Sequence, residues 1–349
     1  MALLEVDDLS VHFTLPGTVL KAVAGVSFRL GRGECLGIVG ESGAGKSVLG
    51  FSLVNLLAPP GRIASGRIRL EGRELTTLSE RRWRAIRGRR MAMVFQDPRA
   101  TLDPLFTVGQ QMHETLRAHR RLSRRLARRM VLHRLHQVGL EAPESQLSRY
   151  PHQLSGGQCQ RVVIAMALLL DPDIIIADEP TTALDVTTQA ELVALLTSLC
   201  RTLDLSLIVI SHDLAVIQQL TQRVLVMYAG RVVESGPTRE VINDPQHPYT
   251  QALIDALPQM YPPRAPLRPI PGSPPAPGAG PAGCAFHPRC RYPHAADDDL
   301  RRRCEGIPPG LIPSSGSEVA CHWVAQLIDH EMIDHEAVDS AEVHDESLG

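Results

Sequence analysis

Residues 40–47 read Gly-Glu-Ser-Gly-Ala-Gly-Lys-Ser and fit the pattern G-x-x-x-x-G-K-[ST]. A short apolar segment, Cys35–Val39, precedes this stretch and is typical of a buried strand, and Val48–Leu57 follows with the character of a helix. Glycines let the backbone curl so that its N–H groups point at phosphate oxygens, and the helix adds its positive N-terminal end. A Gly-rich turn that only links a strand to a helix is the alternative, which the Lys-Ser pair disfavours.

We therefore predict a nucleotide site in this stretch, with Lys46 at the β- and γ-phosphates and the Ser47 hydroxyl on Mg²⁺. The residues that we expect to contact the phosphates are Gly40, Glu41, Ser42, Gly43, Ala44, Gly45, Lys46 and Ser47.

Length and composition indicate a globular protein of one large domain with an appendage, or of two domains. The chain has 349 residues, of which 44% are hydrophobic, and a net charge of −2. It has no apolar stretch of the length that spans a bilayer, and Met1–Ser10 does not resemble a signal peptide. We therefore expect a cytosolic location, with any action at a membrane exerted through partners.

Apolar strand patterns alternate with helical patterns along most of the chain. Alternation of this kind predicts an α/β fold with a doubly wound parallel sheet. Expected strands lie at Leu9–Phe13, Val23–Leu30, Ile63–Leu70, Met91–Phe95, Asp173–Asp178, Leu205–Ile210, Val224–Tyr228 and Arg231–Glu234. Expected helices lie at Ser155–Leu170, Thr187–Leu203 and Asp213–Leu220.

An arginine-rich run interrupts this alternation. Eight arginines lie between Arg117 and Arg134, within a region of mostly helical spacing. Such a run can bind nucleic acid or anionic lipid, or it can be the solvated face of a helix with an apolar stripe toward the core. We favour the solvated face, because no aromatic residue is interleaved to stack on bases.

The C-terminal part has a different composition. Residues 258–283 are dense in Pro, Gly and Ala, which is typical of a linker, and four cysteines follow. The end of the chain, residues 328–349, is acidic and is expected to be a short helix or disordered. We expect three parts: residues 1–257 with a helical subdomain at about residues 99–160, a cysteine-containing extension at residues 258–327, and the acidic tail.

Two further segments have the chemistry of a nucleotide site. An apolar strand ends at Asp178 and is followed at once by Glu179, so one acid can serve Mg²⁺ and the other can polarise the attacking water. Leu154–Gln158 opens a helix, and its Ser and Gly residues can hold an anion there. A chain with two phosphate-binding helix ends can use one on its own ATP and the other on a partner's.

In this order, these segments resemble the motifs of the ATP-binding subunits of ATP-binding-cassette (ABC) transporters, over about residues 3–236. The matching segments are the Walker A motif at Gly40–Ser47, the Q-loop glutamine Gln96, the signature at Leu154–Gln158, the Walker B motif at Ile174–Glu179, the D-loop at Ala183–Asp185 and the switch histidine His212. The resemblance implies a P-loop NTPase cassette with a RecA-like parallel core, an antiparallel β subdomain and a helical signature subdomain.

The resemblance also implies roles for particular residues. Catalysis would rest on Glu179 as general base, with His212, Lys46 and Gln96. Mg²⁺ would lie near Ser47, Gln96 and Asp178. ATP contacts would extend to a partner cassette through the signature and D-loop residues Ser155, Gly156, Gly157, Gln158 and Asp185. Phe13 is the candidate to stack on adenine, and the alternative that it is a strand residue of the core stays open.

Two segments are similar to the oligopeptide/dipeptide importer branch of this family. They are the pair Gln96–Pro98 and Leu102–Pro104, and the stretch Asn243–Leu253, which in the branch opens a C-terminal extension. Gly283–Cys290 and Val319–His322 also match that extension. The resemblance implies a peripheral ATPase on the cytoplasmic face of the membrane. Its partners would be two permeases, a second ATPase in a heterodimer and an extracytoplasmic peptide-binding protein. Importers of nickel or glutathione are close relatives.

The late cysteines Cys284, Cys290, Cys304 and Cys321 point to a metal rather than disulfides if the cytosol is reducing. Four thiolates can hold a 4Fe–4S cluster or a tetrahedral Zn²⁺. The absence of C-x₂-C pairs favours iron–sulfur, and the branch is associated with such a cluster. Cys304 follows an interval that is longer than usual for the branch, which puts it in doubt as a ligand. Four unliganded thiols remain the alternative.

A soluble cassette ATPase that acts on nucleic acid or ribosomes is the competing prediction, because it would explain the arginine run. Proteins of that kind commonly carry two cassettes or a long coiled-coil insertion, which this chain lacks, so we expect no direct nucleic-acid partner. A P-loop kinase does not fit the signature and the D-loop. Neither the cargo nor the choice between a homodimer and a heterodimer follows from the sequence.

Overall fold

The computed structural model describes residues 2–182, 184–256, 269–276, 278, 280–292 and 298–329. An eight-stranded sheet forms the centre, in the order β11-β12-β10-β9-β3-β8-β7-β6. Strands β3 (Cys35–Val39), β8 (Ser206–Ile210), β7 (Ile174–Asp178) and β6 (Met91–Val94) are all parallel. Both faces of these strands are covered, so they carry near-continuous apolar runs.

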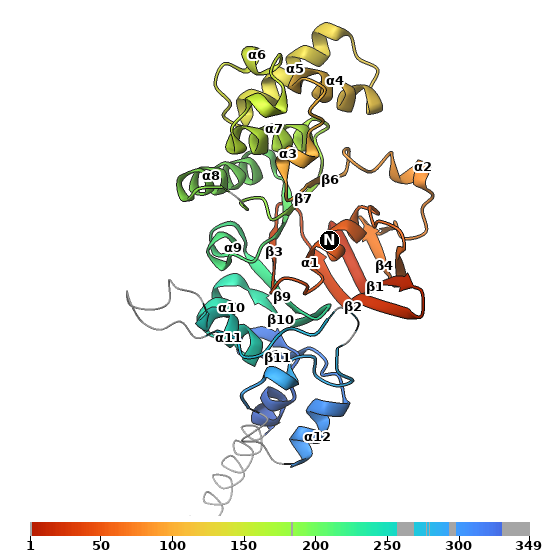
Figure 1. Cartoon of the computed structure of the whole chain (residues 1–349), viewed down its shortest axis with the longest axis vertical. Helices are drawn as coiled ribbons and strands as arrows, with labels where there is room; N and C mark the ends of the chain where they lie inside the picture. Colours follow the sequence, from red (N-terminus) through yellow and green to blue (C-terminus); the bar gives the residue numbers. More distant parts are fainter. Residues whose placement is uncertain are drawn as a thin grey trace, which may run out of the picture.

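The fold is therefore the predicted α/β cassette, with helices on the parallel sheet and a second, antiparallel sheet beside it (Figure 1). Helices α1 (Lys46–Leu53), α8 (Val186–Leu203) and α9 (Leu214–Leu220) follow β3, β7 and β8 in turn. Helix α1 starts two residues before the predicted Val48 and ends before Leu57, because Gly45 caps it in a left-handed conformation and Val54 ends it.

The N-terminal strands are longer than predicted. β1 (Leu4–Leu15) and β2 (Thr18–Leu30) form one long antiparallel hairpin, which β4 (Gly61–Leu70) and β5 (Arg73–Glu74) extend into a four-stranded sheet. Register shifts interrupt the period-2 pattern near Leu9 and Val11, so the sequence suggested shorter strands. The short helix α2 (Glu80–Trp83) connects this sheet to β6.

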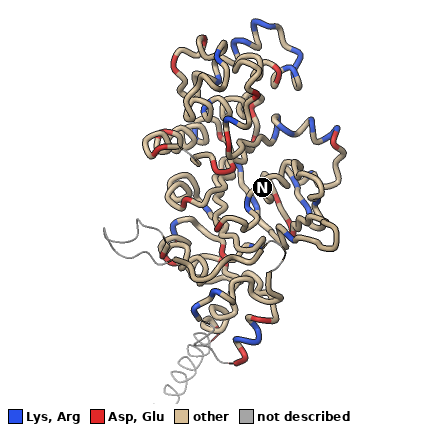
Figure 2. The backbone as a smooth tube through the Cα atoms, viewed as in Figure 1, with Lys and Arg blue, Asp and Glu red and all other residues tan. Residues whose placement is uncertain are grey.

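Residues 98–168 form the helical region. It holds α3 (Pro98–Thr101), α4 (Val108–His119), α5 (Arg124–Gln137), α6 (Pro143–Gln146), the turn η1 (Pro151–Gln153) and α7 (Gly156–Leu168). Figure 2 shows many Lys and Arg residues along α2 and the chain of α4 and α5. Most arginines of α5 are exposed, as the solvated-face interpretation predicted, while Ala127 and Val131 are buried. Arg134 is an exception, because it is buried and pairs with Asp171.

The C-terminal extension joins the central sheet. β9 (Arg223–Tyr228) and β10 (Arg231–Pro237) form the predicted hairpin, and α10 (Thr238–Asn243) and α11 (Pro248–Asp255) follow. Beyond them lie η3 (His287–Arg289), α12 (Asp298–Gly306), β11 (Ile312–Ser314) and β12 (Ser317–Val319). β12 pairs with β10, so the extension continues the sheet edge. The predicted acidic tail lies almost wholly outside the described residues. Within the described part of the chain, no helix has the length and apolarity to span a membrane.

Candidate active site

The glycine-rich stretch forms a tight loop between β3 and α1. Gly45 has a φ of +95° and lies so close to β2 that an added Cβ would stand 2.3 Å from the Ala22 carbonyl oxygen. A side chain at this position would therefore strain the backbone and collide with it. The loop lies between β3 and α1, which is the strand–loop–helix context expected for the sequence pattern.

Lys46 lies inside this loop. Its Nζ donates to the carbonyl oxygens of Gly40 at 2.7 Å and Glu41 at 3.0 Å. Burial lowers the pKa of Lys46, although the nearby carboxylates of Glu179, Asp178 and Glu41 oppose the change. The ammonium group is thus held inside the loop by two backbone carbonyl oxygens.

Two carboxylates end strand β7 beside the loop. Asp178 Oδ1 accepts a hydrogen bond from Ser47 Oγ at 3.0 Å, and burial raises the pKa of Asp178. Glu179 follows with a φ of +50°, which turns its side chain out of the strand. Its Oε2 accepts from Thr182 Oγ1 at 3.0 Å and lies 2.8 Å from His212 Nδ1. Ser47 and Asp178, whose oxygens could bind a cation, therefore lie beside the pair formed by Glu179 and His212.

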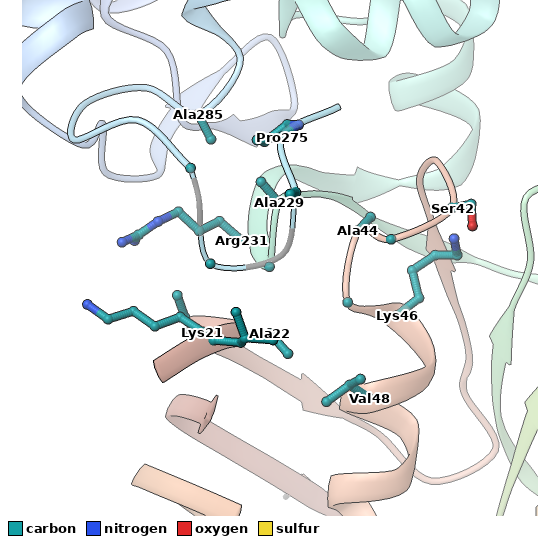
Figure 3. Close-up of a pocket in the computed structure, with 18 of the residues that line it drawn as sticks. Lys21, Ala22, Ser42, Ala44, Lys46, Val48, Ala229, Arg231, Pro275 and Ala285 are labelled. Carbon is teal, nitrogen blue, oxygen red and sulfur yellow. The ribbon is translucent and has the colours of Figure 1, made fainter. Parts of the chain in front are cut away.

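A cavity of about 930 Å³ is lined by Lys46, Ser47, Glu179 and His212, while Gly40, Glu41 and Asp178 are not on its wall. The predicted residues on its wall are Phe13, Ser42, Gly43, Ala44, Gly45, Lys46, Ser47, Gln96, Glu179 and His212. Figure 3 shows Ser42, Ala44, Lys46 and Val48 on one side of it and Lys21 and Ala22 of β2 below. Phe13 both lines the cavity and packs against the core, with Gly61 in close contact. The sequence did not predict that Pro275 and Ala285 of the extension would also line it (Figure 3).

The signature residues lie elsewhere. Ser155 caps α7, with Ser155 Oγ accepting from the Gln158 N–H at 3.2 Å and Gln158 Oε1 accepting from the Ser155 N–H at 3.0 Å. Ser155 is exposed, and Gly156, Gly157 and Gln158 are partly exposed. Asp185 caps α8 through the Thr188 N–H at 2.9 Å. None of these residues is on the wall of the 930 Å³ cavity that the described residues form.

The four late cysteines come together in the extension. Cys284, Cys290, Cys304 and Cys321 all line one cavity of about 20 Å³, under Phe286 and Trp323. Cys304, at the end of the long interval, is one of them. Burial raises the pKa of every thiol, to about 11 for Cys290 and Cys304 and about 12 for Cys321. Among the described residues, no three or more His, Cys, Asp or Glu side chains are arranged to hold a metal ion.

The sequence did not predict the residues that hold Glu41. Arg289 Nη1 donates to Glu41 Oε2 at 2.6 Å, and the Glu41 N–H donates to Tyr249 Oη at 2.8 Å. Both partners come from the C-terminal part of the chain. No local pattern signals contacts between residues so distant in sequence.

Comparison with known families identifies two matching regions. Residues 23–182 match the model described as "ABC transporter", and residues 233–296 match "Oligopeptide/dipeptide transporter, C-terminal region". The first contains the loop, Gln96, the signature and both carboxylates, and the second contains Arg289 and two of the four cysteines.

Curated relatives match nearly the whole chain. The dipeptide transport ATP-binding protein DppD of Bacillus subtilis is 44% identical over 92% of this chain and 94% of the relative. DppD of Escherichia coli is 43% identical over 93% of this chain and 97% of the relative. Among solved structures, the ATP-binding cassette MJ0796 in a dimeric post-hydrolysis state with ADP and Pi has a TM-score of 0.61 and 28% identity, covering 68% of this chain and 99% of that one. The chain is a member of the ATP-hydrolysing ABC transporter family, with the C-terminal region of its oligopeptide/dipeptide branch.

Proposed function

We propose that this chain powers a membrane importer for di- or oligopeptides by hydrolysing ATP. The observation that carries the proposal is that one chain combines the cassette motifs with the C-terminal region at residues 233–296 and is 44% identical to a dipeptide transport ATP-binding protein. Cargo selection would lie in other subunits, so the role of this chain is to convert ATP hydrolysis into movement of the permeases.

The reaction is ATP + H₂O → ADP + phosphate, and Glu179 is the proposed general base. Its carboxylate accepts a proton from the attacking water, while His212, 2.8 Å away, orients it. Lys46 lies inside the loop and neutralises charge on the β- and γ-phosphates. Ser47 and Asp178, already joined at 3.0 Å, would hold Mg²⁺ with Gln96 nearby. When bound, Mg²⁺ offsets the negative charge that develops on the phosphates.

The signature supports a paired arrangement of two cassettes. Ser155 is exposed and lies off the ATP cavity of its own chain, so it is free to meet the phosphates of a partner cassette. Asp185, exposed at the start of α8, would lie at the same interface. A second, different ATPase, two permeases and a binding protein complete the proposed assembly, which places the chain at the cytoplasmic face of the membrane.

The extension is proposed to hold a 4Fe–4S cluster on Cys284, Cys290, Cys304 and Cys321. Four thiols around one cavity are the donor set that such a cluster needs. Burial raises the pKa of these thiols, and a bound cationic centre would favour their thiolate forms. Iron and acid-labile sulfide in anaerobically purified protein test this, and finding neither removes the cluster.

Extraction of the native complex from membranes in mild detergent, followed by mass spectrometry of its subunits, tests the transport assignment. We expect two permeases and a second ATPase. Recovery only from the soluble fraction, with ribosomes or nucleic acid, would overturn the transport role and leave the ATPase chemistry intact.

A further inference from the structure

An ion pair between a buried arginine and a partly exposed glutamate joins the cysteine-containing extension to the glycine-rich loop. Arg289 Nη1 and Nη2 donate to Glu41 Oε2 at 2.6 Å and Oε1 at 3.1 Å, a two-pronged contact between residues 248 positions apart. Only 5% of the Arg289 side chain is exposed. A planar guanidinium that meets a carboxylate in this way fixes orientation as well as charge.

Other contacts fix the arginine in turn. Its Nε donates to the Pro271 carbonyl oxygen at 2.8 Å, and Nη1 also donates to Tyr228 Oη at 3.2 Å. The guanidinium lies 5.7 Å from the ring centre of Tyr228 and 5.9 Å from that of Phe286. Arg289 is thus held rigidly by the strand hairpin and the extension together.

Glu41 is the loop residue on which these contacts converge. The extension holds its carboxylate through Arg289, and α11 holds its N–H through Tyr249 at 2.8 Å. Its carbonyl oxygen accepts from Lys46 Nζ at 3.0 Å. The side chain, N–H and carbonyl of one residue therefore connect the C-terminal part of the chain to the lysine of the phosphate site.

A carboxylate at this position is unfavourable for an anionic ligand unless it is neutralised. Glu41 is not itself on the wall of the 930 Å³ cavity, but it directly precedes Ser42, which is, so its negative charge would repel phosphates bound in the loop. Arg289 supplies the compensating charge from outside the loop.

We propose that Arg289 is a positioning residue of the ATP site, which neutralises Glu41 and holds the phosphate-binding loop in its nucleotide-receiving shape. The proposal rests on the ATPase function proposed above. It assigns to the extension a direct role in nucleotide affinity. Arg289 lies in sequence between Cys284 and Cys290, and both of these cysteines line the cysteine cavity.

The test is MgADP binding by calorimetry to the full chain. Arg289→Met keeps the length of the side chain and removes its charge, and we expect about tenfold weaker binding. Adding Glu41→Gln to that variant removes the uncompensated carboxylate and should restore most of the affinity. Arg291→Ala is the matched control, because the Arg291 side chain is 56% exposed and its Nη1 pairs with Asp255 Oδ2, at 3.8 Å, rather than with Glu41. It should bind as the unmodified chain does.

A role in folding alone gives a different pattern. Thermal unfolding of each variant is measured in parallel, and a lowered melting temperature with unchanged MgADP affinity would overturn the proposal. The proposal would also be overturned if the double variant bound MgADP as weakly as Arg289→Met alone. If Arg289→Met does not fold, Arg289→Lys takes its place. It keeps a positive charge opposite Glu41, so most of the MgADP affinity should be retained, and a loss as large as the one expected for Arg289→Met would refute the proposal. Failure of the unmodified chain to bind MgADP would instead contradict the proposed ATPase function.

Discussion

Glu179→Gln is the substitution that isolates the proposed general base. The glutamine keeps the length of the side chain, and its oxygen can still accept from Thr182 Oγ1, which lies 3.0 Å from the Glu179 carboxylate. The backbone at this position, with a φ of +50°, is unchanged. Folding and ATP binding should therefore persist, while the acceptor for the proton of the attacking water is lost.

The loss of a positioned base costs about 10²- to 10⁴-fold in rate. That range corresponds to roughly 3–5 kcal/mol in the activation barrier. Single-turnover phosphate release by the assembled complex measures the rate, and equilibrium binding of MgATP measures the affinity. We expect the rate to fall over that range with affinity retained.

Glu191→Gln is the matched control, since Glu191 is 59% exposed and pairs only with Arg161 on the surface among the described contacts. It should hydrolyse ATP normally. Undiminished hydrolysis by Glu179→Gln would remove Glu179 from its role, and an equal loss in both variants would show that the effect is not specific to the site.

Three further predictions concern the cap, the extension and pH. Ser155→Ala should lower ATP hydrolysis by the complex but leave MgADP binding by the isolated chain unchanged, since the signature serves the partner's nucleotide; weaker binding by the isolated chain would argue against that. Glu234 accepts hydrogen bonds from the Gln246 and His247 N–H groups at 2.8 and 2.9 Å. Glu234→Ala should therefore lower the free energy of unfolding by about 2–6 kcal/mol, at about 1–3 kcal/mol for each buried donor left unpaired. Urea titrations measure this change, and a change under about 1 kcal/mol would contradict the prediction. Burial lowers the pKa of His247 to about 3, below its unfolded value of about 6.5, so its contribution to stability is complete above about pH 6.5 and is lost as the pH falls toward 3. Urea titrations at pH 7.5 and 5 should show that loss, and His247→Gln should reduce it; an equal loss in both proteins would rule out His247 as the cause.

Features that depend on neighbouring residues were predicted well from the sequence. The strand–loop–helix around Lys46 follows from glycine conformations and apolar periodicity, both of which act over a few residues. The helix cap at Ser155 and the acid pair after β7 are equally local. The loop residues, Glu179 and His212 meet at one cavity because β3, β7 and β8 are parallel and end at the same edge, whereas the cap at Ser155 lies away from that cavity.

Contacts between distant segments were not predicted. Nothing near Glu41 signals that its carboxylate meets Arg289, 248 positions away. The pairing of β12 with β10 rests on two short segments whose apolar patterns are too brief to identify a partner strand. The four late cysteines were expected to act together, but the place of Cys304 among them depends on where α12 packs, which spacing alone does not determine.

ATP hydrolysis by the detergent-extracted complex, reconstituted in liposomes with its binding protein and a dipeptide, tests the central claim most directly. We predict that the dipeptide stimulates hydrolysis and that its uptake into the liposomes depends on ATP, with both abolished by Glu179→Gln in this chain. Hydrolysis that ignores the peptide, with no uptake of it, would contradict the assignment of this chain to peptide import.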